Sequence, residues 1–152
     1  HEGIDLFVPV GTPVRAVEGG IVEAASNEPC QTAGRHVSIQ HADGRYRVVY
    51  MHFSRLDVRT GQAVAAGQQI GLSGKTGGAA SGPGCTFSSA EPHVHITVRA
   101  REDVAAALPA MQRGSHRGAW IAVPAEPLIP AHYSSGVVAK ARQYGVAEVA
   151  AA

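Results

Sequence analysis

Hydrophobic and polar residues alternate with a period of two along the segments 35–40 and 45–53 of the chain. The Asp43-Gly44 pair between these segments is a strong hairpin signal. The alternation therefore predicts two adjacent, half-buried strands. In the second strand it places two sets of side chains on opposite faces: Tyr46, Val48, Tyr50 and His52 on one face, and Arg47, Val49, Met51 and Phe53 on the other.

Glycines interrupt the hydrophobic pattern elsewhere and leave room only for short strands. Five glycines fall within residues 58–77, with Val64 and Ile70 in the intervals. Further short strands are expected over residues 3–6, 14–17, 21–24 and 93–98. This pattern predicts a mainly β protein: a compact antiparallel sheet, barrel-like or sandwich-like, built from short strands with glycines between them.

The last third of the chain has a different pattern. Val104, Leu108 and Met111 recur at helical spacing, which predicts a helix over residues 101–112 that Pro109 ends or kinks. Residues 120–130 are expected to be extended, and the Ala-rich residues 137–152 to form a final helix. We therefore expect a core over residues 1–99 and a C-terminal extension of mixed helix and loop over residues 100–152, packed on the core or following it.

Composition excludes several classes of protein. The formal net charge is +1, whereas a nucleic-acid-binding domain would show a basic patch, and no apolar run approaches the 18 residues of a membrane helix. The chain begins at His1 without an initiator Met, so an upstream segment is expected. Cys30 and Cys85 form no Cys-x-x-Cys motif; they would form a disulfide in an exported protein, or remain two buried free thiols.

Three short patterns carry candidate metal chemistry. His93 and His95 lie on one face of a predicted strand, as neutral imidazole ligands of zinc can. His1 and Asp5, with Gly3 between them, can bring an imidazole and a carboxylate to one metal ion. His52 ends a half-buried strand. Each pattern alone is weak, because a histidine-bearing surface strand, a turn aspartate and a structural histidine are the commoner cases.

Together, these patterns and the segments between them resemble the lysostaphin/LytM-type zinc endopeptidases, which cut peptide bonds in bacterial peptidoglycan. The resemblance extends from residue 1 to about residue 99, and its parts follow the family's order. The matching segments are His1-Glu-Gly3-Ile-Asp5, Gly11-Thr-Pro13-Val, Gly20-Ile-Val, His41-Ala-Asp-Gly44, Tyr50-Met-His52, Val58-Arg-Thr-Gly61-Gln-Ala-Val64, Gly67-Gln-Gln-Ile70-Gly71, Gly74-Lys-Thr76-Gly77 and His93-Val-His95.

The resemblance implies that His1, Asp5 and His95 hold one zinc ion and leave a fourth position for water. Three protein ligands with an open site are typical of catalytic zinc. His52 and His93 would be the two catalytic histidines that do not bind the metal. Because its strand fixes His93 beside the ligand His95, we expect His93 to be the base and His52 the stabilising partner, although the residues alone do not distinguish the two roles.

The resemblance also implies peptidoglycan peptides as the substrate and export to the periplasm or the outer cell wall. It leaves open which peptide bond is cut. One departure from the family pattern is a longer loop, residues 77–92, before the His93-Val-His95 strand, which would reshape one wall of the substrate cleft.

Two other functions are compatible with parts of the pattern. A non-catalytic LytM-like module would bind cell wall or activate another wall hydrolase, but such modules typically lack some of the metal ligands. A biotinyl or lipoyl carrier domain also uses short strands separated by glycines. It needs a modifiable lysine at a hairpin tip, and Lys75, one of only two lysines, has no flanking Met.

Overall fold

The structure, a computed structural model, describes residues 3–41, 44–77, 85–87, 92–106, 116–123 and 140–144, the last five and His116 by their backbone alone. These residues form β1 (Gly3–Phe7), β2 (Pro13–Arg15), β3 (Gly20–Ser26), β4 (Arg35–His41), β5 (Tyr46–Leu56), β6 (Ala63–Val64), β7 (Gln69–Ser73), β8 (His93–Arg101), α1 (Glu102–Ala105), β9 (His116–Arg117), β10 (Trp120–Val123) and β11 (Lys140–Tyr144).

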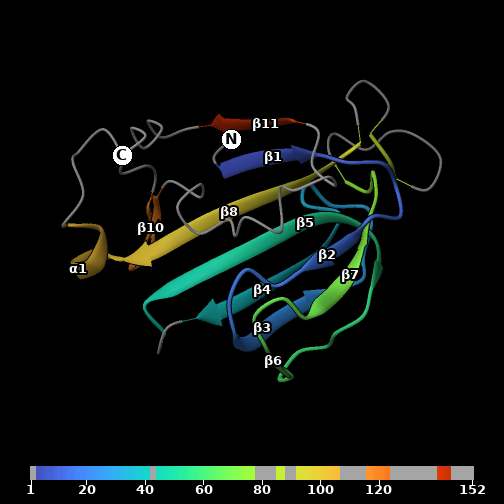
Figure 1. Ribbon diagram of the computed structural model, residues 1–152. Helices are drawn as coiled ribbons and strands as arrows, with labels where there is room; N and C mark the ends of the chain where they lie inside the picture. Colours follow the sequence, from blue (N-terminus) through green and yellow to red (C-terminus); the bar gives the residue numbers. More distant parts are fainter. Residues whose placement is uncertain are drawn as a thin grey trace.

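The long strands β5 and β8 cross the middle of one antiparallel sheet (Figure 1). The sheet order is β11-β1-β8-β5-β4-β3-β6, with β7 joining β5 to β2, and β10 joining β8 to β9. All of these pairs are antiparallel, which confirms the predicted mainly β fold. The neighbours of β8 are β1, β5 and β10, so β8 is the strand on which three parts of the chain meet.

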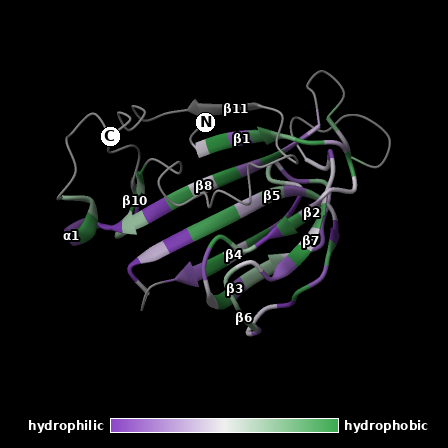
Figure 2. Ribbon diagram, in the orientation of Figure 1, coloured by the Kyte–Doolittle hydropathy of each residue, from purple (hydrophilic) through white to green (hydrophobic). Residues whose placement is uncertain are grey.

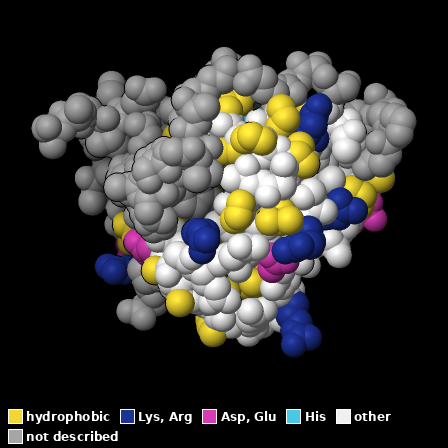
Figure 3. Space-filling model, turned by 45° about the vertical axis from the view of Figure 1, so that its right-hand side comes forward, with side chains coloured by type: hydrophobic (Ala, Val, Ile, Leu, Met, Phe, Trp, Pro, Cys, Tyr) yellow, Lys and Arg dark blue, Asp and Glu magenta, His cyan; other side chains and the backbone are white. Residues whose placement is uncertain are grey.

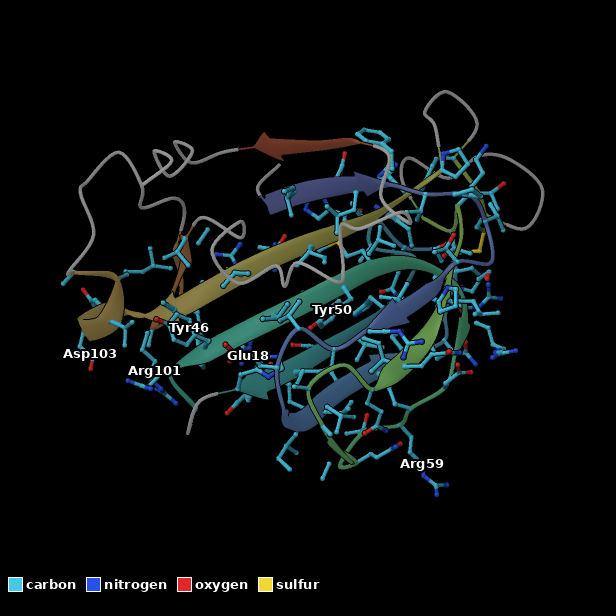
Figure 4. The ribbon with its side chains drawn as sticks, viewed as in Figure 1. Glu18, Tyr46, Tyr50, Arg59, Arg101 and Asp103 are labelled. Atoms are coloured by element: carbon cyan, nitrogen blue, oxygen red, sulfur yellow. A yellow bond between two sulfur atoms is a disulfide. The ribbon has the colours of Figure 1, made fainter. Side chains whose placement is uncertain are left out.

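Alternation along β1, β5 and β8 separates a hydrophobic face from a polar one, and bands of hydrophobic and hydrophilic colour follow one another along β5 and β8 (Figure 2). Ile4, Ile96 and Val48 belong to the buried core. Tyr50 also enters the core from β5, and its hydroxyl accepts a hydrogen bond of 2.9 Å from the backbone N–H of Val17 (Figure 4). Burial raises the pKa of this tyrosine, so its hydroxyl stays neutral.

The alternation predicted for residues 45–53 is wrong at its end. Phe53 lies in the core with Val48 and Tyr50, whereas His52 faces a groove together with Met51. The reason is local backbone geometry, because His52 has a φ of 70° and the pairing of β5 with β7 shifts just after it. A residue in the left-handed region breaks the two-residue period, and the side chains that follow it exchange faces.

Two predicted helices also differ from the structure. Residues 140–144, predicted as part of a final helix, form the strand β11, which pairs with β1. Edge strands have unpaired backbone groups, and pairing with β1 satisfies them, which outweighs the helix propensity of alanine. The helix expected over residues 101–112 is confirmed as α1 for Glu102–Ala105, and residues 107–115 lie outside the described part of the chain.

The strand predicted over residues 120–123 is confirmed as β10, and the domain boundary after residue 99 stays a prediction. No helix in the described part of the chain has the length and hydropathy needed to span a membrane. On the face that Figure 3 presents, Lys and Arg side chains lie at separate places among other side chains and do not gather into one basic patch.

Candidate active site

The two predicted metal ligands that the structure describes lie directly opposite each other on neighbouring strands. Asp5 of β1 pairs with His95 of β8, and the Nδ1 atom of His95 is 2.6 Å from Oδ1 of Asp5. Both residues are almost fully buried, with 4% of Asp5 and 1% of His95 exposed. The register of β1 against β8 thus brings together two donor atoms that are 90 residues apart in sequence.

Gly3 allows β1 to approach this closely. Its φ is 109°, and a Cβ at this position would collide with the backbone oxygen of Ile96 and lie 2.9 Å from Nε2 of His95. Only glycine combines this backbone conformation with the absence of a side chain. The glycine between His1 and Asp5 is therefore required by the close packing over His95.

Thr97, two residues after His95 on the same face of β8, contacts the other ring nitrogen. Its Oγ1 lies 3.0 Å from His95 Nε2. A hydroxyl can donate or accept, so it suits either neutral tautomer of the imidazole. If Nδ1 bound a metal ion, Nε2 would carry the proton and donate it to Thr97, which is how metal-binding histidines are usually oriented.

A carboxylate and an imidazole that converge in a buried site are donors that zinc accepts. Within the described ranges, no three His, Cys, Asp or Glu side chains are placed to hold a metal ion together. The predicted third ligand, His1, lies outside those ranges. Asp5 and His95 thus fit a zinc site, and the assignment of His1 stays a prediction.

His93 lies next to this pair, on the same face of β8. Its Nε2 is 3.7 Å from Oδ1 of Asp5. Its ring stacks on Phe87 with centroids 4.8 Å apart and meets the ring of His52 edge-on at 5.0 Å. The structure therefore brings His52 and His93 together beside the two predicted ligands, as the resemblance implies.

The orientation of His52 is fixed by the backbone of two other segments. Its Nδ1 lies 2.7 Å from the carbonyl oxygen of Thr76, and its backbone N–H donates to the carbonyl of Ala33 over 2.9 Å. Because a carbonyl oxygen only accepts, Nδ1 must carry the proton, and in the neutral ring the lone pair is on Nε2. Burial, together with His93 and His95 nearby, lowers the pKa of His52 to about 4 despite the Thr76 carbonyl, so the ring is neutral at pH 7.

A disulfide holds the segment that positions both catalytic candidates. Cys30 and Cys85 are bonded, which decides between the two states that the sequence left open. The backbone carbonyl of Cys85 accepts a hydrogen bond from the N–H of Gly77, and the backbone N–H of Phe87 donates one to the carbonyl of Lys75. These two bonds anchor the segment on both sides of Thr76. Residues 78–84 and 88–91 of the predicted loop lie outside the described part of the chain.

Thr76, Phe87 and Thr97 are site residues that the sequence analysis did not identify. Thr97 could have been found, because it lies two residues after His95 in a predicted strand. Thr76 acts through its backbone carbonyl, and the sequence gives no sign that the segment near Cys85 places Phe87 against His93.

His52 and His95 lie at one end of a groove of about 1040 Å³. Its floor is formed by the polar faces of β3, β4, β5 and β8, and β9 contributes Arg117 to it. The groove is large enough to hold several residues of an extended peptide, and it leads directly to the buried histidines.

This combination of fold and site matches a known family. Residues 1–106 of the chain match the sequence pattern of Peptidase family M23. The chain belongs to peptidase family M23. The predicted likeness to lysostaphin-type peptidases is thereby confirmed.

Similar proteins include peptidases of Staphylococcus capitis and Vibrio cholerae. The chain is 43% identical over 97 residues to the glycyl-glycine endopeptidase ALE-1 of Staphylococcus capitis, which covers 63% of this chain and 24% of that protein. It is 46% identical over 77 residues to the peptidoglycan DD-endopeptidase ShyA of Vibrio cholerae, covering 51% of this chain and 17% of that protein. The M23 chain thus matches less than a quarter of the length of either relative.

Among solved structures, the catalytic domain of lysostaphin from Staphylococcus simulans is similar with a TM-score of 0.55 at 35% identity. That match covers 66% of this chain and 67% of the lysostaphin domain. The M23 fold identified from sequence and the sheet described above therefore agree.

Proposed function

We propose that this M23 chain is a zinc-dependent endopeptidase that hydrolyses peptide bonds in bacterial peptidoglycan. The observation that carries the proposal is the convergence of Asp5 and His95 at 2.6 Å, with His52 and His93 beside them at the end of a groove. The names of the relatives, a glycyl-glycine endopeptidase and a peptidoglycan DD-endopeptidase, support the substrate.

In this proposal, His1, Asp5 and His95 hold the zinc ion. When bound, zinc polarises the scissile carbonyl and lowers the pKa of a coordinated water. Asp5 and His95 are held on paired strands and buried, so they need little reorganisation to bind it. Thr97 orients His95 through its second nitrogen.

In this proposal, His52 and His93 transfer protons or stabilise charge during the reaction. The neutral ring of His52 carries its proton on Nδ1, held by Thr76, so Nε2 can accept a proton from the attacking water but has none to donate. We therefore assign the role of proton acceptor to His52. His93 becomes the partner that stabilises the developing oxyanion or protonates the leaving amine, which reverses the allocation expected from sequence.

An extracytoplasmic location belongs to the same proposal. Disulfides persist mainly in oxidising compartments, and Cys30 and Cys85 form one beside the site. Peptidoglycan is also found outside the cytoplasmic membrane. We propose that the chain acts in the periplasm or at the outer cell wall.

The activity can be tested with purified cell walls. A drop in turbidity that stops on addition of a chelator and returns with zinc is expected for the wild-type protein. His52→Ala and His93→Ala should each bind zinc normally and lose at least about 100-fold in rate, the usual contribution of a proton-transfer group.

The rival function, a non-catalytic wall-binding module, makes a different prediction. It would bind walls and zinc without lowering turbidity at any pH. That result with a zinc-loaded, folded protein would overturn the proposed peptidase.

A further inference from the structure

Phe87 contacts the rings of both catalytic candidates. Its ring stacks on that of His93, with centroids 4.8 Å apart and an angle of 24° between the planes. It also meets the ring of His52 edge-on, with centroids 5.1 Å apart. Because the rings of His52 and His93 are themselves 5.0 Å apart, the three rings form a closed triangle with sides of similar length. Phe87 thus touches the two groups that the proposed reaction must keep in a fixed relation.

The backbone of β8 does not by itself fix the ring plane of His93. A strand sets the direction of the Cα–Cβ bond, whereas the torsion that turns an imidazole about its Cβ–Cγ bond has broad minima. A flat contact against the face of the ring restricts this torsion. The ring plane matters for catalysis because it decides where the two ring nitrogens of His93 point.

Two other neighbours of His93 contact its ring less closely than Phe87 does. Oδ1 of Asp5 is 3.7 Å from Nε2 of His93, which is beyond hydrogen-bond distance. The ring of Phe7 is tilted by 57°, with its centroid 5.7 Å away. The stacked ring of Phe87 therefore provides the flat contact.

Phe87 reaches this position by pairing with the segment that orients His52. Its backbone N–H donates to the carbonyl of Lys75 over 2.9 Å, and Thr76 forms an antiparallel bridge with Thr86. The ammonium group of Lys75 lies 5.7 Å from the centroid of the Phe87 ring, within the range of a cation–π attraction. The carbonyl of the same Thr76 is 2.7 Å from Nδ1 of His52. One short pairing thus positions the Phe87 ring and the His52 ring together.

The disulfide joins this pairing to a second segment that holds His52. Cys85, two residues before Phe87, is bonded to Cys30 in the connection between β3 and β4. The carbonyl of Ala33 in that connection accepts the backbone N–H of His52 over 2.9 Å. The disulfide therefore links the residues that carry Phe87 to the backbone that fixes His52.

We infer that Phe87 is a positioning residue: its ring sets the plane of the His93 imidazole, and the Cys30–Cys85 bond acts on turnover through it. This inference rests on the proposed function, since it assumes that His93 acts on the substrate. Phe87 belongs to the longer loop over residues 77–92 that departs from the family pattern, so the shared motifs assign it no role. In this role it raises the fraction of molecules in which His93 is aligned.

The kinetic test separates alignment from binding. Initial rates of wall clearance over a range of wall concentrations give a maximal rate and a half-saturating concentration. Phe87→Leu keeps an apolar side chain without the flat ring, so it should lower the maximal rate about tenfold at unchanged half-saturation. Phe87 is partly exposed, so Phe87→Tyr can keep the ring in place with its hydroxyl in water. It should retain the wild-type rate within about twofold.

Tyr46→Leu is the matched control. Tyr46 is a partly exposed aromatic residue at the start of β5, at the other end of the strand from the site (Figure 4). Its maximal rate, expressed per folded and zinc-loaded molecule, should equal that of the wild type. A full rate in Phe87→Leu, or an equal loss in Tyr46→Leu and Phe87→Leu, would overturn the role of Phe87.

The link to the disulfide is tested by combining variants. The maximal rates of Phe87→Leu, of Cys30→Ala/Cys85→Ala and of the variant with all three changes are compared. If the disulfide acts through Phe87, the combined variant should lose no more than the more impaired of its two parents, because the ring is already absent. A combined loss equal to the product of the separate losses would refute this link.

A second readout does not depend on cleavage. Protons that lie over the face of an aromatic ring resonate upfield, so the ring protons of His93 should be shifted in NMR spectra of the zinc-loaded wild type and Phe87→Tyr. They should return downfield in Phe87→Leu, and their signals are assigned by their absence from His93→Ala. A wild type that cuts walls without this shift would refute the positioning role alone. A shift that depends on Phe87 in a protein that cuts nothing would refute the peptidase and leave the ring contact standing.

Discussion

His52 has its backbone in the left-handed region, with a φ of 70°. The resemblance identifies it as a site residue, and it does lie beside His93. Simple alternation, however, assigns it to the core face with Tyr50. The positive φ of His52 turns it into the groove, and a histidine gives no sign in sequence that its backbone is left-handed. By contrast, the shared face of His93 and His95 follows from strand geometry alone, and the structure confirms it.

The backbone conformation of His52 leads to a stability prediction. A non-glycine residue in the left-handed region costs about 1–2 kcal/mol. His52→Gly should therefore be more stable than His52→Ala by about 1 kcal/mol, the reverse of the usual order for these residues. Chemical denaturation of the two variants measures this difference. An alanine variant as stable as the glycine variant would mean that the position is unstrained.

The burial of His52 leads to a pH prediction for the metal-free protein. Its pKa is lowered from 6.5 to about 4 in the folded state, chiefly by burial, so between these values the unfolded state binds more protons. The stability contributed by neutral His52 is thus fully present above pH 6.5 and is lost as the pH falls towards 4. The loss should reach about 3 kcal/mol over this range.

The control for this titration is His52→Gln, which has no ionisable group at the site. The free energy of unfolding is measured for the metal-free wild type and the variant from pH 7 to pH 4, and it should fall more steeply with decreasing pH in the wild type. Equal pH dependence of the two free energies would show that His52 does not titrate in this window.

At the scale of elements, β8 and its neighbours were largely predictable, and the C-terminal elements were not. β1, β5 and β8 alternate, and their registers bring Asp5 and His95 together. β11 was predicted as helix because its residues favour a helix, and only the presence of the β1 edge explains a strand there. Within residues 77–92, Phe87 stacks on His93, and the role of this loop as a cleft wall stays a prediction.

The Cys30–Cys85 bond connects this segment to the site, and removing it should affect both stability and turnover. The two cysteines are 55 residues apart, and closing a loop of that size stabilises a fold by roughly 4 kcal/mol. A Cys30→Ala/Cys85→Ala variant should lose about that much free energy of unfolding. Since Phe87 and Thr76 would be less well held, its rate of wall cleavage should also fall while zinc content stays normal.

Both effects can be measured on one preparation, by denaturation and by the turbidity assay below the unfolding temperature. The wild type treated with reductant serves as a second route to the same state. A folded double variant with undiminished turnover would show that the disulfide stabilises the chain without positioning the catalytic histidines.

At the scale of the whole molecule, the order of the family motifs predicted the fold and the candidate ligands together. Asp5, His52, His93 and His95 lie close together, as the resemblance implied, and His52 and His95 line one groove. The arginines that line this groove were not predictable. Arg47 and Arg99 lie on two strands that pair although they are far apart in sequence, and Arg117 comes from the extension, where sequence reasoning found no chemistry.

In the proposed site, Asp5 and His95 bind zinc, whereas His93, on the same strand face, does not. Elemental analysis of zinc in purified wild type, His95→Ala and His93→Ala tests this assignment most directly. About one zinc ion per chain is expected in the wild type and in His93→Ala, and none in His95→Ala, provided that circular dichroism shows all three folded. Full zinc content in His95→Ala, or its loss in His93→Ala, would refute this ligand assignment.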